Sequence, residues 1–129
     1  MFGNNLTAMP DLVIIVVNEL QINARGNENS AYSLTILHEI QPGYAFVTAP
    51  DFKISGEKIL SHVLGTGAGL AGKEVYCTST VSDVRPDTNV TNVRIIVYKD
   101  GIKIDDQTFS HEVAVPNQSI VYNTIIKFI

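Results

Sequence analysis

The chain has 129 residues and a mass of 14.1 kDa, which is enough for one compact domain and too few for two ordinary ones. Hydrophobic residues make up 45% of it and charged residues 17%, which excludes disordered, collagen-like and coiled-coil proteins, so we expect a single soluble domain over residues 1–129. Nine Lys and Arg against thirteen Asp and Glu give a net charge of −4 without a basic cluster, so nucleic acid is not an expected partner.

Alternation of apolar and polar side chains predicts three strands in the first third of the chain. Residues 12–22 begin as a continuous apolar run and then alternate, which suits a central strand. The even positions of 31–40 are mostly apolar, which predicts a strand with one buried face and a partly buried His38. Pro42-Gly43 predicts a turn that leads into a strand over 44–48.

Residues 56–64 are ambiguous between a short helix and a strand. Ser55 could cap a helix there and Gly65 could end it. Its apolar side chains have the spacing of a helical stripe: Ile59, Leu60, Val63 and Leu64. The pattern leaves both possibilities open, with one short helix as the largest helical content that we expect.

The second half of the chain predicts further strands over 74–82, 109–115 and 119–129, where β-branched and aromatic residues are frequent. Between them, residues 93–106 alternate on both sides of Asp100-Gly101, which predicts a hairpin with a tight turn. Polar turn segments recur at the intervals of a sandwich or barrel. We therefore predict an all-β fold, a two-sheet antiparallel β-sandwich.

One segment adds a resemblance to this pattern. Residues 97–104 read Val-Tyr-Lys-Asp-Gly-Ile-Lys-Ile, which resembles a hairpin common in immunoglobulin-like domains. The resemblance implies a sandwich that is immunoglobulin-like in general architecture, and it assigns no function to any residue, because such folds host many unrelated functions.

The glycine-rich segment 65–73 is the one motif that looks like binding chemistry. It reads Gly-Thr-Gly-Ala-Gly-Leu-Ala-Gly-Lys and contains both GxGxxG and GxxxxGK. Consecutive N–H groups of such a loop can hold phosphate or sulfate, so the candidates for an anion-binding loop are Gly67, Gly69, Gly72 and Lys73. Glu74 stands where a nucleotide loop needs Ser or Thr, and a strand follows. The alternative is a loop that only joins two elements.

No catalytic residue, metal site or cofactor is expected. In His38-Glu39 and His111-Glu112 the neighbouring side chains of a strand point to opposite faces, so neither pair converges on one metal ion. Cys77 lies in a strand and is expected to be a small buried side chain rather than a nucleophile. Asp83, Asp87 and Asn89 could bind calcium or could be solvated turn residues.

The sequence also bears on location. The longest apolar run, 12–17, is far shorter than a membrane-spanning helix, and no secretory signal is visible. A single cysteine excludes a disulfide-stapled secreted scaffold. A cytoplasmic location without a membrane span is therefore the favoured expectation.

The last strand is apolar on both faces, which predicts that something covers its second face. The candidate interface residues are Ile125, Lys127, Phe128 and Ile129. We expect a homo-oligomer: a non-enzymatic structural or protein-interaction module that self-assembles through apolar strand surface. The alternative is a lectin-like, calcium-binding or anion-binding sandwich that uses loops 65–73 and 83–89.

Overall fold

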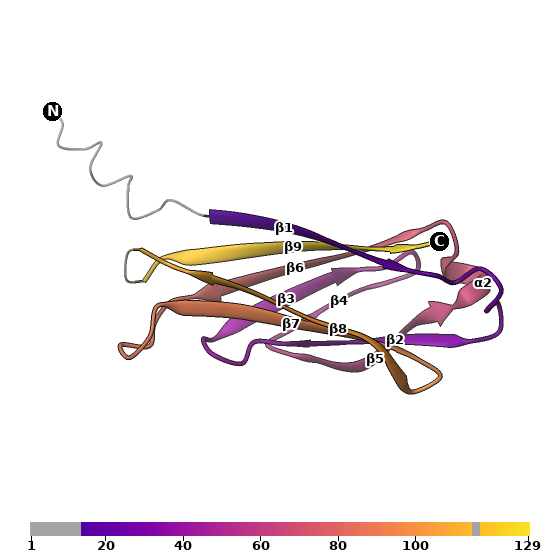
Figure 1. Ribbon diagram of the computed structural model, residues 1–129, viewed down its shortest axis with the longest axis horizontal. Helices are drawn as coiled ribbons and strands as arrows, with labels where there is room; N and C mark the ends of the chain where they lie inside the picture. The colour runs from indigo at the N-terminus through magenta and orange to yellow at the C-terminus, as the bar shows by residue number, and fades with distance from the viewer. Residues whose placement is uncertain (1–13, 115–116) are drawn as a thin grey trace, which may run out of the picture.

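The computed structural model describes residues 14–114 and 117–129, which form two sheets packed face to face (Figure 1). One sheet has five strands in the order β1-β9-β6-β3-β4: β1 (Ile14–Ile22), β9 (Ser119–Phe128), β6 (Glu74–Ser82), β3 (Gly43–Thr48) and β4 (Lys53–Gly56). The other has four in the order β5-β2-β7-β8: β5 (Ile59–Thr66), β2 (Ala31–Leu37), β7 (Val90–Lys99) and β8 (Ile102–Glu112). The predicted all-β sandwich is confirmed.

The strand at the start of the described chain lies at an edge, and its pairing differs from expectation. β1 pairs only with β9 among the described strands, in parallel, from Ile14 beside Ile120 to Ile22 beside Phe128. The other strand pairs are antiparallel. The prediction of a central strand was wrong, because β1 is an edge strand. The outward side chains of its apolar run, Ile15 and Val17, are exposed. Residues 12 and 13 of that predicted strand lie outside the described residues.

The core lies between the two sheets and is built by strict alternation. In β9 every second side chain is buried, and these residues are Ile120, Tyr122, Thr124, Ile126 and Phe128. Tyr32 of β2 meets Phe128 edge to face, with ring centroids 5.4 Å apart. The C-terminal strand is therefore a central part of the core.

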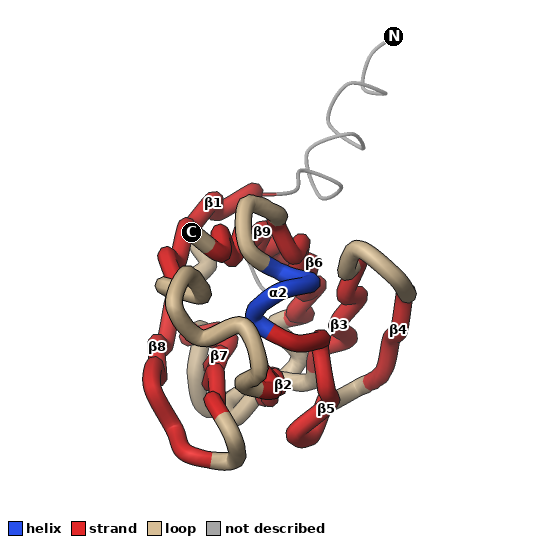
Figure 2. The backbone as a smooth tube through the Cα atoms, turned by 90° about the vertical axis from the view of Figure 1, so that its right-hand side faces the viewer, coloured by secondary structure: helices blue, strands red, loops and turns tan. Residues whose placement is uncertain are grey.

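The ambiguous segment 56–64 belongs mostly to β5 and contains no helix. Ser61 has a positive φ of 44°, and the pairing of β5 with β2 shifts register on either side of Leu34. The helix lies further on, in α2 (Gly67–Leu70), which closes one end of the sandwich (Figure 2). No helix among the described residues is long and apolar enough to cross a membrane.

The predicted hairpin between β7 and β8 is present, and its turn has the expected positive φ at Asp100 (52°) and Gly101 (80°). The Asp100 side chain accepts a hydrogen bond from the Ala31 N–H at 2.9 Å, which lowers the pKa of this carboxyl group. The separate strand predicted over 109–115 is instead the second half of β8, which ends at Glu112, and residue 115 lies outside the described residues.

Candidate functional site

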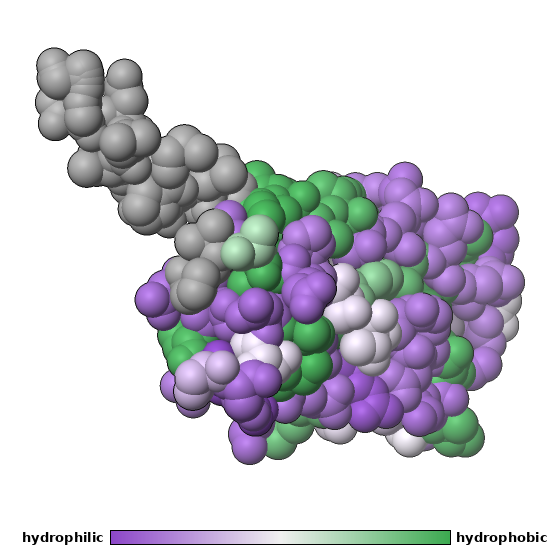
Figure 3. Space-filling view, turned by 60° about the vertical axis from the view of Figure 1, so that its left-hand side comes forward, coloured by the Kyte–Doolittle hydropathy of each residue, from purple (hydrophilic) through white to green (hydrophobic). Residues whose placement is uncertain are grey.

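The outer face of the five-stranded sheet carries five of the eleven exposed large hydrophobic side chains of the described chain. Val17 of β1 is 66% exposed and Phe46 of β3 is 52% exposed. This outer face also carries exposed Ile15, Tyr44 and Tyr76 and half-buried Val121 and Ile125. Figure 3 shows hydrophobic side chains gathered where β1 begins. A sandwich needs only one covered face per sheet, so this second apolar face needs an explanation.

The strand register arranges these side chains in rows across the sheet. One row runs Ile15, Val121, Thr80, Tyr44, and the next runs Val17, Asn123, Thr78, Phe46, Ser55. Polar groups inside the rows are paired, since the Thr78 hydroxyl donates to Asn123 Oδ1 at 3.0 Å. The rings of Tyr44 and Phe46 lie 5.2 Å apart. The outer face is therefore a continuous surface of apolar and hydroxyl groups.

Charged residues lie at one end of the outer face. Lys127 Nζ lies 3.2 Å from Glu19 Oε1 and 3.9 Å from Glu74 Oε2. The hydrogen bond from Lys127 lowers the pKa of Glu19. The Tyr76 hydroxyl donates to the Glu74 carboxylate, which raises the pKa of Tyr76. This end forms a polar rim beside the apolar rows.

The predicted interface residues are divided by the structure. Ile125 and Lys127 point outward on the outer face, between β1 and β6. Phe128 is only 1% exposed and lies in the core, so its side chain cannot form surface contacts. Ile129 is half-exposed beyond the strand end, where its carbonyl accepts from the N–H groups of Ala24 and Arg25. β9 is not an edge strand, because β1 pairs with one side of it and β6 with the other.

The glycine loop uses its N–H groups within the chain. Those of Gly67, Gly69, Gly72 and Lys73 donate to Ser30 O, Thr66 Oγ1, Phe128 O and Leu70 O respectively. An anion-binding loop needs N–H groups that point to the ligand, and the four candidate residues have none to spare. The geometry instead gives the loop a packing role, because buried Leu70 seals the end of the core.

Loop 83–89 does not gather its oxygen atoms around one point. Asp83 is buried and accepts from Gln41 Nε2 at 2.9 Å, whereas exposed Asp87 pairs with Arg85 at 2.5 Å. The hydrogen bond from Arg85 lowers the pKa of Asp87. This loop follows the end of β6 that is opposite to α2, so loops 65–73 and 83–89 lie at opposite ends of the sandwich (Figure 1).

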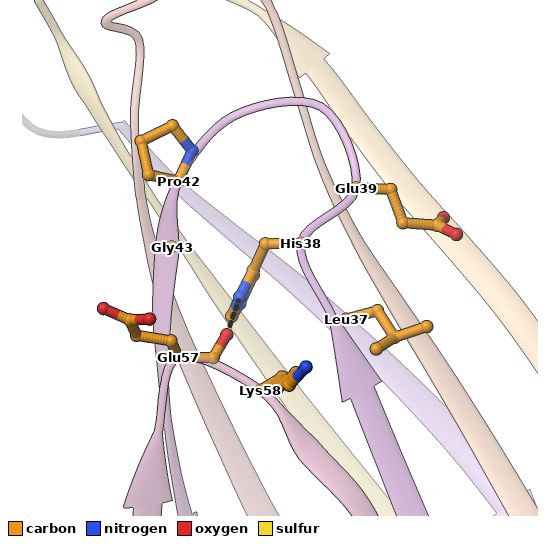
Figure 4. A pocket seen from close by; sticks show the side chains of 7 residues that line it. All are labelled: Leu37, His38, Glu39, Pro42, Gly43, Glu57 and Lys58. Atoms are coloured by element: carbon orange, nitrogen blue, oxygen red, sulfur yellow. Dashed lines mark hydrogen bonds between the residues drawn. The ribbon is translucent and has the colours of Figure 1, made fainter.

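A pocket of about 380 Å³ lies beside His38 (Figure 4). The His38 Nδ1–H donates to the Glu57 carbonyl at 2.9 Å, so in the neutral ring Nε2 accepts from the Ser79 hydroxyl, also at 2.9 Å. Burial lowers the pKa of His38, and the bond to Glu57 partly opposes this. Ser79 is only 3% exposed. A nucleophile must reach its substrate, so this Ser–His contact is a buried structural pair.

The remaining candidate groups also stay apart. His62 packs against Phe52, and His111 lies on β8, away from His38. Cys77 is buried, as the sequence predicted, and burial raises the pKa of its thiol to about 12. Among the residues that the structure describes, no three His, Cys, Asp or Glu side chains could hold one metal ion.

Comparison with protein-family models, with curated proteins and with solved structures finds no match for this chain. Its function must therefore be argued from the described surface, above all from the exposed apolar side chains of the outer face.

Proposed function

We propose that this chain is a non-enzymatic structural or protein-interaction module, immunoglobulin-like in general architecture, that self-assembles through apolar strand surface. The exposed apolar side chains of the outer face, which lie in rows together with hydroxyl and amide groups, are the observation that carries the proposal, because monomeric proteins rarely expose apolar patches larger than a few hundred Å². Aromatic side chains are enriched at protein interfaces, and three of them are exposed on this face: Tyr44, Phe46 and Tyr76.

The polar groups of the described residues support a module without catalysis. The Ser79 hydroxyl and the Cys77 thiol are enclosed, and their reactivity is limited by burial. The pocket beside His38 is open to solvent, and no Ser, Thr or Cys is among its lining residues, which are Leu37, His38, Glu39, Pro42, Gly43, Glu57 and Lys58. A ligand-binding module is the weaker proposal, because loops 65–73 and 83–89 cannot form one shared site from opposite ends.

The test is the mass of the protein in solution, measured by light scattering coupled to size exclusion at tens of micromolar. We expect a mass above 14.1 kDa for the native chain. Phe46→Asp places a charge in the centre of the outer face and should return the mass to that of a monomer.

Leu60→Asp is the matched control, because Leu60 is 60% exposed on β5 of the other sheet. This variant should keep the native mass. A monomeric native chain at these concentrations would overturn the proposal, and so would equal effects of the two substitutions.

A further inference from the structure

The two halves of the outer face differ in chemistry. Aliphatic side chains lie on β1 and β9, and these are Ile15, Val17, Val121 and Ile125. The exposed aromatic side chains lie on β3 and β6, with β6 in the middle of the sheet. A partner that presents an aromatic half to β1 and β9, and an aliphatic half to β3, would therefore match this face.

The charges show the same division between the two edges. One row crosses all five strands in the order Glu19, Ile125, Tyr76, Thr48, Lys53. It places a carboxylate on edge strand β1 and an ammonium group on edge strand β4. Lys53 is exposed and has no ion pair with any described residue. In this row a carboxylate and an ammonium group therefore lie at equal distances from β6, and the carboxylate also pairs with Lys127 of its own copy at 3.2 Å.

We infer that two copies of the chain pack these faces together around a two-fold axis parallel to β6, with Glu19 of each copy opposite Lys53 of the other. This inference rests on the proposed function, and it names the partner as a second copy in one orientation. The axis also places Val121 opposite Tyr44, an aliphatic side chain against an aromatic one, and the Asn123 amide opposite Phe46. Packed sheets lie about 10 Å apart, a gap that a Glu and a Lys side chain together can span.

The competing two-fold arrangement has its axis perpendicular to the strands, through Val17. Each strand then meets its own copy, and the register sets Glu19 opposite Ile15. That orientation places the Glu19 carboxylate against an apolar side chain and separates Lys53 from Glu19 of the other copy. Burying an unpaired charge is costly. The charges therefore favour the axis parallel to β6.

The area of the outer face is sufficient for a stable dimer. Five strands spaced about 4.8 Å apart and four rows of outward side chains, each about 6.7 Å apart, cover roughly 650 Å² per copy and roughly 1,300 Å² in total. Specific interfaces bury about 1,200–2,000 Å² in total. The axis also brings Glu74 of the two copies together at the polar rim, where Lys127 of each copy lies 3.9 Å from its own Glu74.

Charge reversal tests this arrangement in the full chain, with the dimer dissociation constant measured by analytical ultracentrifugation at low salt. Lys53→Glu is the diagnostic variant, because Lys53 has no ion pair within its own described copy. It should raise the dissociation constant at least about tenfold, since the dimer contains the contact twice and like charges repel across an interface. Glu19→Lys should have a similar effect, and the double variant should return to within about threefold of the native value.

Glu112→Lys on β8 is the control for a general effect of charge, and it should leave the dissociation constant unchanged. Unchanged dimerisation in Lys53→Glu, or a double variant no better than the singles, would overturn the arrangement. If Phe46→Asp still breaks the dimer in that case, the proposed function survives without this orientation. A monomeric native chain would overturn both.

Discussion

Gly67→Ala should destabilise the fold far more than the same change two residues later. An added Cβ at Gly67 would lie 2.0 Å from the Asn27 carbonyl oxygen and 3.2 Å from that of Ala24. A Cβ at Gly69 would meet nothing nearer than Thr66 Oγ1 at 3.6 Å, which is an ordinary contact. Both glycines belong to the GxGxxG motif, but only Gly67 lacks room for a Cβ.

The cost at Gly67 follows from the segment that must move. The loop at Asn27 has to retreat by about 1 Å or more, because non-bonded atoms pack no closer than roughly 3–3.5 Å. This movement stretches the hydrogen bonds from Gly67 N to Ser30 O (2.9 Å) and from Ala68 N to Glu28 O (3.0 Å). Overpacking costs about 1–3 kcal/mol and each lost hydrogen bond about 0.5–1.5 kcal/mol, so with two bonds we expect a loss of about 2–6 kcal/mol.

Urea unfolding followed by circular dichroism measures this free energy. Gly69→Ala should be neutral or should stabilise the chain by up to about 1 kcal/mol, as Ala does in a helix. Gly72→Ala should cost about 1–2 kcal/mol, because its φ of +78° strains an L residue although no atom lies within 4 Å of the new Cβ. If Gly67→Ala costs no more than Gly72→Ala, the close approach to Asn27 does not hold and the packing role of the loop is refuted.

Two further predictions concern buried titratable groups. His38 is held neutral between Glu57 and Ser79 and its pKa is lowered, so the unfolded chain takes up this proton first and native stability should fall as pH drops below the ordinary histidine value of about 6.5. The fall between pH 7.5 and 5.5 should be steeper for the native chain than for His38→Gln in urea titrations, and equal slopes would contradict the buried pair. The Cys77 thiol, with its pKa raised to about 12, should react with a thiol reagent only as fast as the protein unfolds. Rapid labelling of the native protein would show that Cys77 is accessible.

Local alternation predicted most strands, and a bulge explains where it misled. In β5 the buried side chains are Ile59 and Leu64, while Leu60 and Val63 are exposed. The positive φ at Ser61 and the shifted register mark a bulge in β5. At a bulge the side chains no longer alternate strictly between the two faces of the sheet. The four apolar residues of β5 therefore have the spacing of a helical stripe although they lie in a strand. The spacing of apolar residues in the sequence cannot distinguish a bulged strand from a short helix.

Apart from the β7–β8 hairpin, whose turn was readable, the pairing partners of the strands could not be predicted, because a period of two reports a buried face and not a neighbouring strand. The apolar face of Val121 and Ile125 was visible in the sequence, but its extension across Phe46 and Val17 required the register. β4 was missed, since Lys53–Gly56 is a short edge strand with one half-buried apolar side chain, Ile54. The helix α2 has a glycine-rich sequence with weak helical preference, and tertiary contacts hold it.

The parallel pairing of β1 with β9 determines how the fold would respond to mechanical force. The strands run in the same direction, so the start of β1 and the end of β9 lie at opposite ends of the molecule (Figure 1). A force that separates Ile14 from Ile129 therefore acts along both strands and loads their whole ladder in shear. The interstrand bonds must break together rather than one after another, and a chain of such domains linked end to end would resist extension at every link.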